Sequence, residues 1–218
     1  MSLPFLQPYF GLSNSLQTAQ GSESVGVSAT RGVFGGGNEP AINDMSFITI
    51  ATTGNTTDFG DLTVSRSHLT GLGSSTRGVF GGGYPSLPGL NVMDYITIAT
   101  TGNAVDFGDL TVARYVLGAV NSDVRGVFGS GYTGSYSNVM DYITIATTGN
   151  AVDFGDLTVS RSGAAGVNST TRGCFGGGST GSFTNVIDYI TIATTGNAVD
   201  FGDLSTNINN IGGVQNGM

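Results

Sequence analysis

The chain has 218 residues, which is enough for one domain or one repeat array with a buried core. Its 7 basic residues, all arginine, stand against 15 acidic residues for a formal net charge of -8, so no cation cluster is available to neutralise a nucleic-acid backbone. No apolar run approaches the length of a transmembrane helix, and we expect no membrane insertion.

Residues 1–18 are predicted to be an apolar N-terminal extension. The opening MSLPFLQPYF lacks the basic start and continuous apolar run of a signal peptide, and residues 1–22 contain no charged side chain. Exposed apolar segments usually mark a surface for a partner. The segment is therefore predicted to anchor an assembly, with flexible disorder as the alternative. The candidate anchor residues are Phe5, Leu6, Tyr9 and Phe10.

One phrase recurs four times along the rest of the chain. RGVFGGG, or a close variant, begins at Arg31, Arg77, Arg125 and Arg172, in steps of 46, 48 and 47 residues. Each copy is followed by a version of NVMDYITIATTGNAVDFGDL. A fixed period of this size indicates copies of one supersecondary unit. The repeats are assigned to residues 19–204, with units at about 19–63, 64–111, 112–158 and 159–204.

Each repeat is predicted to form four β-strands, near 22–30, 31–37, 45–52 and 56–63 in the first copy and at equivalent positions later. In the third copy, VMDYITIATTG alternates apolar and polar residues and ends in a tight-turn signal, Gly149-Asn150. A four-stranded meander of this length is the size of one propeller blade, and a solenoid of stacked repeats is the competing arrangement. The period of two predicts burial of the isoleucines on one face: Ile96, Ile98, Ile143, Ile145, Ile190 and Ile192.

Two further features of the repeats have both a chemical and a structural interpretation. The string DFGD recurs four times, and its two carboxylates are ligands of the type that Ca²⁺ binds. The alternative is that the aspartates accept hydrogen bonds from nearby backbone at a strand end or bulge. Cys174 replaces Val79 and Val127, so it is predicted to be a small core residue and not a reactive thiol. No cofactor is expected.

The segments between the second and third strands differ most between copies: 38–44, 84–93, 132–140 and 179–187. In an up-and-down sheet they share one face with the connections from one repeat to the next. Aromatic residues interleaved with Ser and Gly are typical of adaptable recognition surfaces, whereas tolerated drift in exposed loops is the alternative. The candidate binding residues on this face are Tyr84, Tyr132, Tyr136, Phe183, Arg66, Arg114 and Arg161.

The unit resembles the kelch repeat over residues 19–204. A glycine pair closes the second strand at Gly35-Gly36, Gly81-Gly82 and Gly176-Gly177, and an aromatic residue follows the Asp of the third strand at Tyr95, Tyr142 and Tyr189. The chain has no Trp where kelch repeats usually place one. The resemblance implies an all-β, kelch-like β-propeller of four four-stranded blades, with apolar extensions at 1–18 and 205–218.

The repeated phrases are also similar to kelch-like arrays in structural proteins of tailed phages, especially those infecting marine cyanobacteria. This resemblance implies a virion location, other virion proteins and further copies of the chain as partners, and no catalytic residues. We therefore expect a non-enzymatic virion protein, a tail, fibre or head-decoration component, that uses a rigid propeller for assembly and display. The alternative is a propeller that binds a host-surface glycan or receptor through the variable loops. A propeller enzyme would need a non-repeated polar cluster, and the sequence does not contain one.

Overall fold

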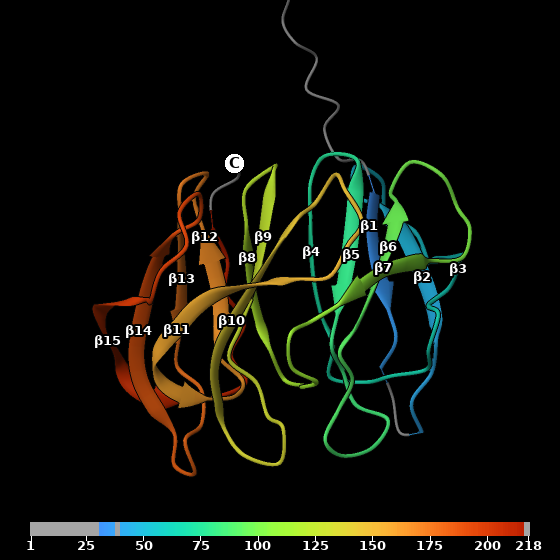
Figure 1. Ribbon diagram of the computed structural model, residues 1–218. Helices are drawn as coiled ribbons and strands as arrows, with labels where there is room; N and C mark the ends of the chain where they lie inside the picture. The colour runs from blue at the N-terminus through green and yellow to red at the C-terminus, as the bar shows by residue number, and fades with distance from the viewer. Residues whose placement is uncertain (1–30, 38–39, 216–218) are drawn as a thin grey trace, which may run out of the picture.

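The computed structural model describes residues 31–37 and 40–215. Their secondary structure is β throughout, and the strands form four antiparallel sheets in which neighbours follow chain order (Figure 1). No helix in these ranges is long and apolar enough to cross a bilayer. The all-β class and the meander connectivity predicted from the repeat are therefore confirmed.

The strand bounds repeat from sheet to sheet. The first sheet contains β1 (Arg31–Gly35), β2 (Asp44–Thr49) and β3 (Thr57–Asp61). The second contains β4 (Thr70–Gly73), β5 (Arg77–Gly81), β6 (Val92–Thr97) and β7 (Val105–Asp109). The third contains β8 (Gly118–Asn121), β9 (Arg125–Gly129), β10 (Ser137–Thr144) and β11 (Val152–Arg161). The fourth contains β12 (Ala165–Asn168), β13 (Arg172–Gly176), β14 (Thr184–Thr191) and β15 (Val199–Ile208). The predicted strand at 22–30 lies outside the described residues.

A bulge occurs at the same place in every sheet, and in the first three sheets it lies close to the backbone of the next sheet. In the second sheet, the register of β6 against β7 shifts between Met93 and Asp94, opposite Gly108 at a φ of 132°. A Cβ on Gly108 would lie 2.5 Å from the carbonyl carbon of Gly149 in the next sheet. Glycine is required here both for the backbone conformation and for the close approach.

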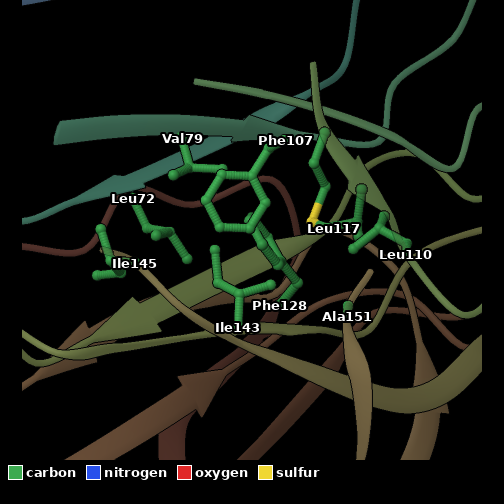
Figure 2. Close-up of a cluster of buried hydrophobic side chains, with 10 residues drawn as sticks. Leu72, Val79, Phe107, Leu110, Leu117, Phe128, Ile143, Ile145 and Ala151 are labelled. Carbon is green, nitrogen blue, oxygen red and sulfur yellow. The ribbon is translucent and has the colours of Figure 1, made fainter. Parts of the chain in front are cut away.

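The hydrophobic core lies in the seams, by which we mean the contacts between neighbouring sheets. Figure 2 shows one such cluster, in which Leu72, Val79 and Phe107 from the second sheet meet Ile143 and Ile145 from the third. Five of the six isoleucines predicted to be buried are buried. Ile98 is only half-buried, because it borders a groove beside Arg31 in the seam between the first and second sheets.

The four sheets do not close into a ring. Phe107 and Phe154 are each 2 % exposed, whereas the equivalent Phe201 in the fourth sheet is 53 % exposed. At the other end, Phe34 is 58 % exposed while its counterpart Phe128 is fully buried. Figure 1 places β3 and β15 on opposite sides of the molecule. The closed ring that a four-bladed propeller implies is therefore not formed, because each terminal sheet leaves uncovered the face that the inner sheets bury.

The repeat pattern continues past the boundary predicted at Leu204. One residue at the start of each repeat has a positive φ and bonds to its equivalent in the repeat before: Val116 N donates to His68 O at 3.0 Å, and Gly163 N donates to Val116 O at 3.0 Å. Asn210 extends this ladder, because its N–H donates to Gly163 O at 3.1 Å and its φ is 50°. The hydrogen-bond ladder of the repeat therefore continues to Asn210, past Leu204, although no strand is assigned at 209–215.

Candidate functional site

The repeated charged residues lie in the seams and pair with one another. Arg114 and Asp141 form an ion pair at 2.6 Å in which both side chains are fully buried, and Arg66–Asp94 at 2.6 Å and Arg161–Asp188 at 2.8 Å repeat it. The Thr111 hydroxyl donates to the other oxygen of Asp141. Each pair ties the connection that enters a sheet to the third strand of that sheet.

The chain supports each buried guanidinium with further contacts. Arg114 Nε donates to Ser130 O at 3.0 Å, and Nη2 donates to Phe128 O at 3.3 Å. A Cβ on Gly131, at a φ of 124°, would lie 3.0 Å from Arg114 Cδ, so glycine lets the backbone cover the arginine stem. Burial lowers the pKa of Arg114 from its ordinary value, and the charge of Asp141 opposes this shift. The pKa of Arg66 and that of Arg161 are lowered for the same reason.

A second set of arginines joins each sheet to the next at the opposite end of the strands. Arg125 Nη1 donates to Ile192 O at 3.2 Å and to Ala193 O at 2.8 Å, and its guanidinium lies 4.3 Å from the centre of the Tyr142 ring. Arg31 and Arg77 make equivalent bonds to carbonyls of the following sheet. The repeated charges of both sets therefore hold the array together.

The first aspartate of each DFGD string follows the structural alternative, because its carboxylate accepts from nearby backbone. Asp106 Oδ1 accepts from Gly108 N at 3.2 Å, and Asp109 N donates to Asn150 Oδ1 of the next sheet at 3.0 Å. Within the described residues, no group of three or more His, Cys, Asp or Glu side chains is placed to hold a metal ion. Cys174 is half-buried in β13, and burial raises the pKa of its thiol while the charge of Arg172 opposes the shift.

An aromatic cluster lies on the face formed by the variable loops. The centres of the Tyr84 and Tyr115 rings are 4.6 Å apart, those of Tyr115 and Tyr132 are 5.7 Å apart, and those of Tyr132 and Tyr136 are 5.2 Å apart. His68 makes edge contacts with Tyr84 and Tyr115, each at 6.3 Å. The four tyrosines are half-exposed and His68 is exposed. We call these five residues the aromatic cluster.

Backbone pairing explains why residues from two loops and two connections meet. Ser67 and Tyr84 exchange backbone hydrogen bonds of 3.1 and 2.7 Å, and Tyr115 and Tyr132 exchange bonds of 3.2 and 2.8 Å. Each connection into a sheet therefore pairs with the loop that follows the second strand of that sheet. This confirms that the variable loops and the connections share one face. Burial raises the pKa of Tyr115, and the neighbouring phenols of Tyr84 and Tyr132 add to the shift.

The structure separates the predicted site residues into three groups. Tyr84, Tyr132 and Tyr136 meet in the aromatic cluster, whereas Phe183, 58 % exposed, makes no ring contact with it. The prediction that arginines line the loop face is wrong, since their partners are buried aspartates. The candidate anchor residues in 1–18 lie outside the described residues. The arginines placed inside the seams are Arg66, Arg114 and Arg161.

Two members of the aromatic cluster were missed from the sequence. His68 and Tyr115 are in the connections, each within two residues of a repeated arginine, and only the arginines of these connections were predicted to be binding residues. The available signal was that Ser67, Tyr115 and Ser162 occupy one position of the repeat and only Tyr115 is aromatic. Compared with models of known protein families and with curated proteins, the chain matches none.

Proposed function

We propose that this chain is a non-enzymatic structural protein whose four sheets are blades of an open, kelch-like propeller array. The observation that carries the proposal is the seam network, in which buried Arg–Asp pairs repeat with nearly the same geometry three times. A residue that serves the same contact in every repeat supports a scaffold, because catalysis needs an asymmetric arrangement. The array would hold one loop face rigid for display.

The setting that we propose is a virion, on the basis of the phrases shared with phage structural arrays. Other virion proteins would then be its partners. The test is to purify particles from the source that encodes the chain and probe them with an antibody against it. We expect the protein to co-sediment with intact particles, and its presence in the soluble fraction alone would contradict the proposal.

Display can be tested on the same particles with thiol labels. Leu87, 61 % exposed, lies in the loop between β5 and β6 on the face of the aromatic cluster, and Val124, 66 % exposed, lies in the hairpin at the other end of the strands. Single Leu87→Cys and Val124→Cys substitutions in a Cys174→Ser background should both react with a maleimide in the free protein. On particles, Leu87→Cys should remain reactive, and its protection would overturn the display of this face.

A second candidate function, binding of a host-surface glycan, is favoured by the aromatic cluster. Half-exposed tyrosines offer flat apolar rings for a sugar and hydroxyls that both donate and accept hydrogen bonds. The test is a glycan array with the wild type, Tyr115→Ala and, as the matched control, Phe183→Ala, which removes an exposed aromatic ring outside the aromatic cluster. Binding lost in Tyr115→Ala and kept in the control would support this function, and equal binding by all three or by none would reject it.

A further inference from the structure

The outer face of the fourth sheet contains a groove. At the equivalent positions of the inner sheets, side chains of the following sheet fill this space. Val167, Arg172, Cys174, Phe201 and Val214 line a groove of about 520 Å³ on this face. In the third sheet the equivalent positions are closed, because Ile192 packs in one cluster with Val120, Val127 and Phe154. The groove is therefore one side of a seam, and no following sheet among the described residues covers it.

The arginine that would donate hydrogen bonds across that seam, Arg172, also has no carbonyl acceptor from a following sheet in the described part of the chain. Arg31, Arg77 and Arg125 each donate to carbonyls of the following sheet, but the exposed Arg172 has no following sheet among the described residues. A Cβ on Gly155 would meet the carbonyl oxygen of Gly196 at 2.5 Å, whereas around Gly202 there is nothing within 4 Å. The unfilled face thus repeats the inner seams in both its apolar and its polar positions.

The first sheet carries the matching side of the seam. Ile145 and Ile192 fill the equivalent grooves of the second and third sheets and are 0 % and 1 % exposed. Their equivalent in the first sheet, Ile50, is 62 % exposed. Phe175 packs its ring 2.9 Å from the position of a Cβ on Gly129. The equivalent Phe34 is 58 % exposed, and Gly176 has no aromatic ring near it.

The two faces also match at the positions of the buried Arg–Asp pair, where a single remaining charge would be buried without a partner. The inner seams contain Arg–Asp pairs, and removing one partner of such a pair leaves an uncompensated buried charge. In the repeat, Ile208 stands where Arg114 and Arg161 stand, and Ser46 stands where Asp141 and Asp188 stand. Both charges are absent together, so the fourth sheet can meet the first without burying an unpaired ion.

We propose that the fourth sheet of one copy of this chain binds the first sheet of a second copy, in the geometry of the inner seams. Ile50 of the second copy fills the groove, its carbonyl accepts from Arg172, and Phe34 packs on Gly176. A second copy is the occupant because its first sheet supplies these groups at their repeat positions, which an unrelated partner does not. The contact that we propose is made by β1, β2 and the turn after β2 and requires no placement of residues 1–30.

Such a contact is head-to-tail and joins two different faces, so it produces rings or open chains and not a two-fold dimer. The experiment measures mass by sedimentation velocity over a range of concentrations. The wild type should associate, and Phe201→Glu and Ile50→Glu should each be monomeric, because each buries a charge in one face. An equimolar mixture of the two variants should form a dimer that does not grow, since it retains one intact face of each kind.

Matched controls separate the faces from general surface effects. Phe183→Glu and Val124→Glu change exposed apolar residues away from both faces and should associate like the wild type. A monomeric wild type at every concentration would overturn the proposal. Association of the Ile50→Glu variant in the absence of the other variant would also overturn it, because it would mean that the chain associates without an intact first-sheet face.

Cys174 supplies a second readout within the groove. In the associated wild type, Ile50 of the second copy would cover the thiol, so the rate of alkylation by iodoacetamide should fall as protein concentration rises. In Ile50→Glu, which leaves the groove unchanged, the rate should not depend on concentration. A wild-type rate that is equally independent of concentration would contradict the proposed contact even if the chain associates by another surface.

Discussion

A buried ion pair costs desolvation free energy, and this chain contains three of them at equivalent positions. For the Arg114–Asp141 pair, two kinds of hydrogen bond offset this cost. The second oxygen of Asp141 accepts from Thr111, and backbone carbonyls accept from Arg114. Removing both charges is therefore a smaller disturbance than removing one. In the proposed contact between two copies, Ile208 of one copy and Ser46 of the other would stand at these positions, so both charges would be absent from that seam.

We expect Arg114→Met and Asp141→Leu each to lower the free energy of unfolding by about 3–5 kcal/mol, because each leaves the other charge buried and unpaired. The double variant should lose clearly less than the sum of the two single losses. Urea denaturation of the four proteins gives the coupling free energy as a double-mutant cycle. Additive losses would mean that the two side chains contribute independently and that the pair is not the unit of stability.

At the residue scale, burial could be predicted from the sequence where the pattern is local. The alternation in the third strand places Ile143 and Ile145 on one face independently of how the sheets pack, and both are buried. The role of Arg66 could not be found in this way, because its partner Asp94 is 28 residues away and meets it only once the sheet has formed. A charged residue beside variable loops was therefore interpreted as a surface residue.

At the scale of the element, the bulge opposite each DFGD string sets how closely two sheets pack. Gly108 and Gly202 have the same φ of 132°, but only Gly108 faces a following sheet among the described residues. Comparing substitutions at Gly108 and Gly202 therefore separates the cost of the backbone conformation from the cost of disturbing the contact between sheets. The four strands of a repeat could be predicted from turn residues and alternation, whereas the bulge could not, because a glycine within a strand does not by itself reveal what approaches it.

We expect Gly108→Ala to destabilise the fold more than Gly202→Ala does. Both substitutions impose a positive φ on alanine, at a cost of about 1–3 kcal/mol. Gly108→Ala adds a Cβ only 2.5 Å from the backbone of Gly149, so it must also open the seam. Thermal unfolding of the two variants under identical conditions measures the difference. Equal losses would show that the close approach contributes nothing beyond backbone strain.

At the scale of the whole molecule, the main contacts between sheets of the described residues join successive sheets. Other repeat proteins are built in this way, and their stability is the sum of repeat and neighbour terms. The sequence predicted the number of repeats, since period and copy number can be counted directly. It did not predict that the ring is open, because closure depends on the small rotation between sheets and no single residue records it. The open ends, as we propose, and the apolar segment at 1–18, as the sequence predicts, would be two separate routes to assembly.

Deleting residues 2–14 should separate these two routes. The deletion removes no strand of the four sheets, so we expect unchanged far-UV circular dichroism and an unchanged melting temperature. Head-to-tail association should persist in sedimentation velocity, because Ile50 and the groove beside Arg172 are intact, while incorporation into particles should be lost with Phe5, Tyr9 and Phe10. Each of these aromatic side chains would bury roughly 150–250 Å² against a partner, so their joint removal should be visible. Normal incorporation of the truncated protein would mean that the segment is no anchor and that the terminal faces alone drive assembly.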